Sequence, residues 1–206
     1  MLNSIANPLD SYAKRVREDL FVQAVSVQGG EADLAGEKAA FARITLSGHG
    51  CDSPVPDARA TRRQETAVLK LTDAEELATQ LGEVLNVMSR SSAARVAPAM
   101  GLWSWRAEPP LDDDVLVVGM EATVVAIREG AKVSPTVRLE LIGMPVGELR
   151  LGVPPIHFQR AIFSGSRQVQ SLISSLKKVA RSAREQQRLD VYVPQDRPVA
   201  PLVLIS

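Results

Sequence analysis

The stretch Arg43-Ile44-Thr45-Leu46-Ser47-Gly48 is matched 95 residues later by Arg138-Leu139-Glu140-Leu141-Ile142-Gly143. Apolar and polar side chains alternate in both stretches, which is typical of a strand with one buried face. Apolar residues at helical spacing match at the same offset: Leu77, Leu81 and Val84 correspond to Leu172, Leu176 and Val179. Because one offset holds over a strand, a loop and a helix, we predict a duplicated unit of three or four strands followed by a helix. The alternative is that hydrophobic periodicity makes any two such units look alike.

Five segments follow from this pattern. They are an N-terminal helix at 1–19, a first repeat at 20–90, a linker at 91–114, a second repeat at 115–188 and a C-terminal strand tail at 189–206. The first repeat is expected to contain strands at 20–27, 41–46 and 63–71. Gly29-Gly30 and Gly48 are expected to end the first two strands, and 49–60 to form a loop.

The second repeat follows the same plan. Its predicted strands are 115–128, 136–142, 147–153 and 156–163, its predicted helix is 166–187, and 190–193 and 201–205 are tail strands. Each helix has one apolar stripe and each sheet needs one face covered. We therefore predict an α+β fold of two tandem antiparallel sheets, each with its own helix, in a pseudo-twofold arrangement.

Composition places the chain among ordinary globular proteins. It has 206 residues, of which 45% are hydrophobic and 23% charged. The start lacks the pattern of a secretory signal, and no apolar run approaches the roughly 18 residues of a membrane span. We expect a cytoplasmic protein without a membrane partner. Cys51 is the only cysteine, which excludes an internal disulfide and a thiolate metal cage.

Charge is balanced overall but unevenly distributed. Residues 115–188 carry 11 Lys/Arg against 5 Asp/Glu, whereas residues 1–114 carry 12 against 17. The basic second half either packs on the acidic first half or faces a polyanion. The zero net charge argues against a protein that is uniformly basic for duplex DNA.

Catalytic signals are poor. The two histidines, His49 and His157, lie in no metal-binding spacing, and no phosphate-binding or nucleophile-elbow motif occurs. Asp112-Asp113-Asp114 suits either Mg²⁺ or a solubilising run. We expect no enzyme activity, no cofactor and no bound metal.

Binding signals come from arginines on predicted strands. Strand alternation turns Arg138 and Arg150 away from the apolar face, with His157 and Gln159 in the same phase on the next strand. We expect Arg138, Arg150 and Arg160, with Arg43 in the other repeat, to meet phosphates on the helix-free face of the sheet. A merely solvated face is the alternative.

Two tryptophans and an arginine stand in the linker. Trp103, Trp105 and Arg106 are expected to stack on unpaired bases, unless the indoles pin the linker onto the core. Lys177, Lys178, Arg181, Arg184 and Arg188 make the end of the second predicted helix basic, which also suits the helix dipole.

The order of four strands followed by a helix, with the helix start at Thr72-Asp73-Ala74-Glu75, resembles the Whirly and positive-cofactor coactivator type of single-stranded nucleic-acid-binding proteins. The resemblance covers residues 20–187, rests on element order and carries over no family residue. It implies that two units combine their sheets and bind unpaired strands across them. The chain differs from these proteins in its zero net charge and its low aromatic content.

The leading hypothesis is a non-catalytic nucleic-acid-binding protein that prefers single-stranded DNA, in replication, recombination or transcription control of bacterial or mobile DNA. The alternative is a protein-interaction or assembly module that uses an exposed sheet face or edge, either with another protein or as a homo-oligomer. An enzyme with a site assembled from scattered residues is a third hypothesis.

Overall fold

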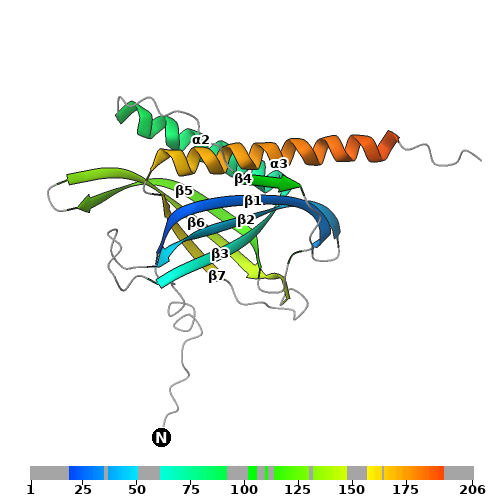
Figure 1. Cartoon of the computed structure of the whole chain (residues 1–206), viewed down its shortest axis with the longest axis horizontal. Helices are drawn as coiled ribbons and strands as arrows, with labels where there is room; N and C mark the ends of the chain where they lie inside the picture. Colours follow the sequence, from blue (N-terminus) through cyan, green and yellow to red (C-terminus); the bar gives the residue numbers. More distant parts are fainter. Residues whose placement is uncertain are drawn as a thin grey trace, which may run out of the picture.

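Two long hairpins form the framework of the fold. β1 (Leu20–Leu34) pairs antiparallel with β2 (Glu37–Gly50), and β5 (Val115–Glu129) pairs antiparallel with β6 (Lys132–Pro145). β3 (Thr61–Lys70) extends the first hairpin beside β2, and β7 (His157–Phe163) extends the second beside β6. The computed structural model (Figure 1) describes residues 19–34, 37–50, 61–91, 102–105, 110, 114–129, 132–147, 157–163 and 165–192.

Two helices lie on one side of these strands. α2 (Leu71–Ser91) follows β3 without a loop, and α3 (Ser166–Tyr192) follows β7. The helices pack against each other, and Figure 1 shows them lying along the same face of the sheet. The opposite face carries no helix among the described residues, which confirms an α+β fold.

The strands of both halves join in one sheet, so the prediction of two separate sheets is wrong. β3 runs parallel to β5 at Val115–Leu116, and β7 runs parallel to β1 at Leu20–Val22. Because β1 also pairs with β2, the described strands β1, β2, β3, β5, β6 and β7 form a closed ring. β4 (Leu102–Trp105) pairs parallel with β1 farther along, at Ser26–Gly29.

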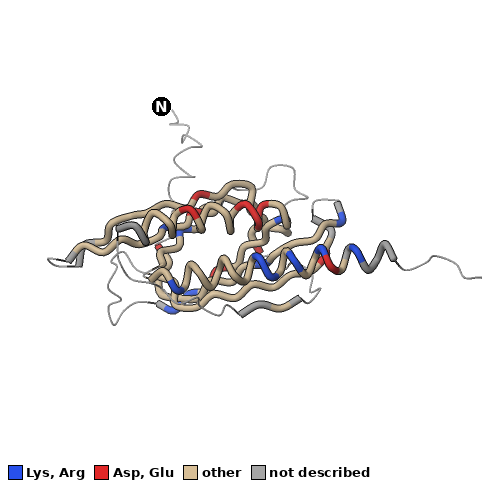
Figure 2. Tube along the Cα trace, turned by 90° about the horizontal axis from the view of Figure 1, so that it is seen from above, with Lys and Arg blue, Asp and Glu red and all other residues tan. Residues whose placement is uncertain are grey.

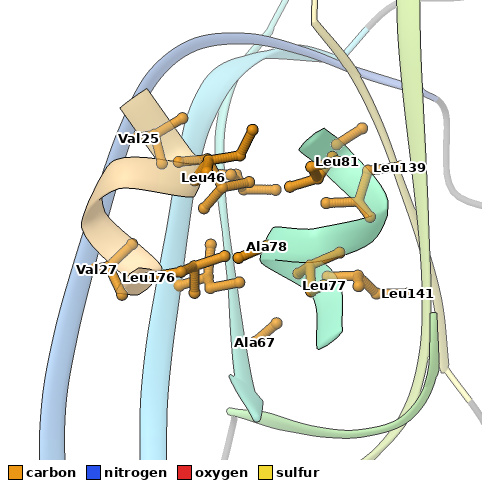
Figure 3. Close-up of a cluster of buried hydrophobic side chains, with 14 of the residues drawn as sticks. Val25, Val27, Leu46, Ala67, Leu77, Ala78, Leu81, Leu139, Leu141 and Leu176 are labelled. Atoms are coloured by element: carbon orange, nitrogen blue, oxygen red, sulfur yellow. The ribbon is translucent and has the colours of Figure 1, made fainter. Parts of the chain in front are cut away.

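One apolar core lies between the sheet and the helices. It contains Val25 and Leu46 from the first hairpin, Leu139 and Leu141 from the second, and side chains from both helices (Figure 3). The helix residues come from the predicted stripes: Leu77, Leu81, Leu172 and Leu176 are buried, whereas Val84 is only partly buried. The helix stripes predicted from spacing are therefore confirmed.

The two hairpins share their register and its irregularities. Both change register near their start, between Val22 and Ala24 in β1 and between Val117 and Gly119 in β5. A Cβ added at Gly48 would lie 1.8 Å from the carbonyl oxygen of Phe21, and one at Gly143 would lie 2.4 Å from that of Leu116. Both glycines thus allow a neighbouring backbone to approach more closely than any side chain would permit.

Several predicted boundaries differ from the structure. β1 continues through Gly29-Gly30, which pair with Ala42 and Phe41 in the antiparallel ladder. β2 likewise continues through Gly48 and His49 to Gly50. α3 extends to Tyr192, so residues 190–192 are helical and not a tail strand. The linker contains β4 as well.

Several predictions fall on residues that the structure does not describe. These are the helix within 1–18, the loop at 51–60, the strand residues 148–153 and the tail strand at 201–205.

Candidate nucleic-acid interface

The helix-free face of β6 and β7 carries the charged residues that the sequence singled out. In β6, Val137, Leu139 and Leu141 are buried against the helices. Strand alternation therefore turns Arg138 and Glu140 to the opposite face. The register places Arg160 of β7 opposite Glu140. Two of the predicted arginines, Arg138 and Arg160, are thus brought together.

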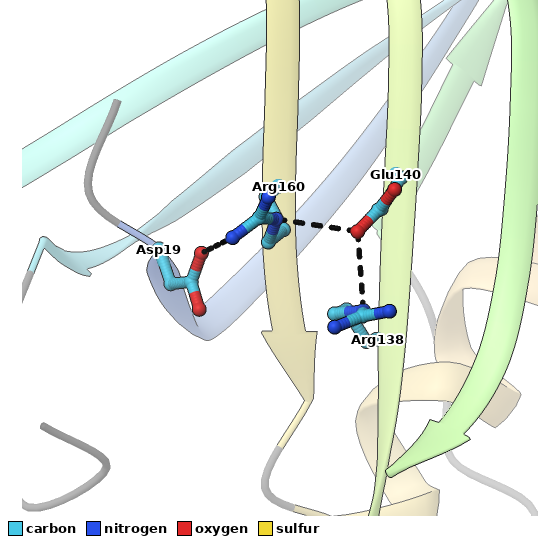
Figure 4. Close-up of polar contacts among 4 residues, drawn as sticks. All are labelled: Asp19, Arg138, Glu140 and Arg160. Carbon is cyan, nitrogen blue, oxygen red and sulfur yellow. Dashed lines mark hydrogen bonds and ion pairs between the residues drawn. The ribbon is translucent and has the colours of Figure 1, made fainter. Parts of the chain in front are cut away.

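Two carboxylates hold these arginines in a chain of ion pairs (Figure 4). Arg160 contacts Asp19 through Nη1 and Glu140 through Nε, each at 3.2 Å, and Arg138 Nε lies 3.2 Å from the same Glu140 oxygen. The four side chains are each about one-third exposed, at 28–38%. Their formal charges cancel, so a phosphate that binds there competes with the two carboxylates for the guanidinium groups.

Phe158 extends this face with an aromatic ring. It precedes Arg160 by two residues in β7, so both side chains point the same way. Phe158 is 44% exposed and pairs with Ile142, while Val118 at the register change of β5 is 58% exposed. Phe158 was not among the predicted site residues, because the outward phase of β7 was assigned to His157 and Gln159.

That phase assignment is wrong for Gln159. Its side chain is buried, and its Nε2 donates a hydrogen bond to the carbonyl oxygen of Thr66 at 3.1 Å. The buried neighbours Ala161 and Phe163 share its phase. The first four residues of β7, 157–160, do not show which phase faces the core. Ala161 and Phe163 do, because both are apolar and share one phase.

Arg43 does not belong to this surface. It is only 7% exposed, and its guanidinium forms a buried ion pair with Asp114. Asp114 is the last of the three acids for which the sequence allowed a role as Mg²⁺ ligand, and its carboxylate pairs with Arg43. Here it anchors the start of β5 to β2.

The linker residues are placed only in part. The backbones of Trp103 and Trp105 lie in β4, which runs beside β1 and contacts α3 (Figure 1). Their side chains lie outside the described residues, as do Arg106 and Arg150. The β4 backbone pairs with Ser26–Gly29, beyond the segment of β1 that meets β7.

A second charged surface lies on the helices. Lys177, Arg181, Arg184 and Arg188 of α3 line a hollow of about 480 Å³, together with Glu75, Thr79, Ala180 and Glu185. Arg184 forms an ion pair with Glu75 of α2 at 2.5 Å. Figure 2 shows basic positions along α3 across from acidic positions on α2. Part of the basic second half therefore does face the acidic first half.

Neither helix offers a stretch apolar enough to span a membrane. Within the described ranges, no three His, Cys, Asp or Glu side chains gather where they would hold a metal ion.

No protein-family model, no curated protein and no solved structure matches this chain.

Proposed function

We propose that this chain is a non-catalytic nucleic-acid-binding protein that prefers single strands and acts in the cytoplasm on bacterial or mobile DNA. The observation that carries the proposal is the line of Phe158, Arg160 and Arg138 on the helix-free sheet face. An exposed aromatic ring offers a stacking platform for an unpaired base, and guanidinium groups beside it suit the adjoining phosphates. A duplex keeps its bases stacked inside and offers no such face to Phe158.

Because Arg138 and Arg160 already form ion pairs, we expect them to bind phosphates weakly and in a salt-dependent manner. Each phosphate contact on a single strand contributes a slope of about −0.7 to the plot of log affinity against log salt. Contacts from Arg138 and Arg160 alone would therefore give a slope of about −1.4. Such a shallow slope distinguishes this face from the basic row on α3, where more cations would be engaged.

The duplication predicted from the sequence belongs to the same proposal. We propose that residues 20–91 and 115–186 are two copies of one unit related by a pseudo-twofold. The common 95-residue spacing of the hairpin turns, the register changes and the glycine pair Gly48 and Gly143 supports this. Residues at equivalent positions of the two copies then lie on one continuous helix-free face. Only the second copy has the aromatic ring of Phe158 and the arginines Arg138 and Arg160 on that face.

Binding of fluorescein-labelled oligothymidine, followed by fluorescence anisotropy, tests the nucleic-acid proposal. Replacing Phe158 by Ala should weaken binding by about 1–3 kcal/mol, or roughly 5- to 150-fold. Gln64→Ala is the matched control, because Gln64 occupies the corresponding place beside Ser47 in β3 and is also exposed. Absence of binding at low salt, or an equal effect of both variants, would remove the proposal.

A protein-interaction module is the second candidate, and the exposed apolar side chains of Val118 and Phe158 favour it. In that case Phe158→Ala would change the oligomeric state or the capture of a protein partner, and oligothymidine would not bind. Sedimentation velocity of both variants, with and without oligothymidine, separates the two functions.

A further inference from the structure

The side of the molecule where α2 meets β5 has an incompletely covered apolar surface. Met120 and Ala122 of β5 are only partly buried against the core, and Val124 in the same phase is 39% exposed. Val84, Leu85 and Met88 of α2 are likewise only partly buried. We call these six residues the α2–β5 strip.

The corresponding surface on the other side of the molecule is covered. Val179, Ala180 and Ala183 of α3 stand 95 residues after the three α2 residues of the strip, and all three are buried. Val25 and Val27 of β1 stand 95 residues before Met120 and Ala122, and both are buried. On that side β4 pairs with β1 and lies against α3.

The edge of β5 beside the strip corresponds to the edge that β4 occupies. β4 pairs with Ser26–Gly29, whose counterparts are Glu121–Val124. Among the described strands, β5 meets β3 on this edge only at Val115–Leu116. Unpaired backbone groups beside exposed apolar side chains are the features that recruit a further strand.

We propose that the α2–β5 strip binds Pro201-Leu202-Val203-Leu204-Ile205 of the same chain as a strand parallel to β5. The proposal rests on the internal duplication but not on nucleic-acid binding. β4 begins 11 residues after the last residue of α2, and Val203 lies 11 residues after the last residue of α3, which is six residues longer than α2. Ten intervening residues span up to about 33–36 Å when extended. The segment is apolar and β-branched at two positions, as the occupant of an apolar strip must be.

Disulfide trapping tests the proposal in the full-length chain. In a Cys51→Ser background, Thr123→Cys is combined in turn with Leu202→Cys, Val203→Cys, Leu204→Cys and Ile205→Cys, under oxidised glutathione. A strand presents alternate side chains to one face, so alternate positions should form an intramolecular disulfide at least about tenfold faster than the others. Gln28→Cys is the matched control, because Gln28 is the counterpart of Thr123 and its edge is occupied by Ser104 of β4.

Three results would overturn the proposal. They are equal trapping at all four tail positions, equal trapping by the Gln28→Cys control, and disulfide-linked dimers in place of intramolecular bonds, which would show a second copy in the strip.

Hydrogen exchange gives an independent measurement. Val203→Pro should speed exchange of the amides in Glu121–Val124 at least about tenfold and leave Ser26–Gly29 unchanged, because proline disrupts strand pairing. Neither readout involves an oligonucleotide, so failure of the nucleic-acid proposal would leave it standing.

Discussion

The two parallel junctions of the ring have similar backbones but different side chains. Where β3 meets β5, Arg43 and Asp114 form a pair that is almost fully buried. Where β7 meets β1, Asp19 occupies the position that corresponds to Asp114, but it contacts the partly exposed Arg160, which shares Glu140 with Arg138. The comparison shows that the same backbone arrangement holds a buried ion pair at the first junction and partly exposed charges at the second.

Removing the carboxylate of Asp114 should have the largest effect. Asp114→Ala removes the carboxylate of a buried ion pair with the Arg43 guanidinium, which costs about 3–5 kcal/mol of unfolding free energy. Asp19→Ala removes a partly exposed contact and should cost at most about 1 kcal/mol. Urea unfolding of both variants measures the difference, and equal losses would contradict the contrast between the junctions.

Replacing the glycines near the ends of β2 and β6 should have the next largest effect. Gly48→Ala and Gly143→Ala each force a Cβ against a backbone carbonyl, which costs about 1–3 kcal/mol, with the larger loss at Gly48, where the space is tighter. Gly82→Ala in α2 meets no atom within 4 Å and should stabilise the chain by about 0.5–1 kcal/mol. Thermal unfolding of the three variants tests this order, and a stabilised Gly48→Ala variant would contradict the close approach.

Neutralising Glu140 should have the smallest effect. Glu140→Gln removes the charge that Arg138 and Arg160 share, so oligothymidine affinity should rise by about two- to fivefold at low salt and less at high salt. Stability should change by less than about 1 kcal/mol. Anisotropy titrations at two salt concentrations measure the change, and unchanged or weaker binding would argue against phosphate contacts at this junction.

Local patterns were sufficient to predict the main elements. Alternation placed Leu139 and Leu141 on the buried side of a strand, and helical spacing placed Leu77 and Leu172 in the core. Gly29, Gly30 and Gly48 were wrongly predicted to end strands, because a glycine within a strand and a glycine in a turn have the same sequence signal. Only the partner strand, here the backbone around Phe21, distinguishes them.

The candidate site was predictable only in part, because its pairing is not local. Arg138 was identified by alternation and by charge, and Arg160 by charge alone. Arg43 has the same sequence context as Arg138, and its burial depends on Asp114, 71 positions away. Phe158 was missed because the outward phase of β7 was assigned to His157 and Gln159, although Ala161 and Phe163 indicated the buried phase. The parallel junctions that complete the core are absent from any local pattern.

Because the six strands form a closed ring, a fragment with only half of the strands exposes strand edges that are paired in the whole chain. A half consisting of β1, β2, β3 and α2 would have two open strand edges, one on β1 and one on β3, which in the whole chain are occupied by β7 and β5. Such a fragment, expressed alone, would satisfy both edges by associating with a second fragment, so we expect it to be a dimer. A chain cut between α2 and β5 would for the same reason stay assembled, and the peptide bond there would be dispensable for the architecture.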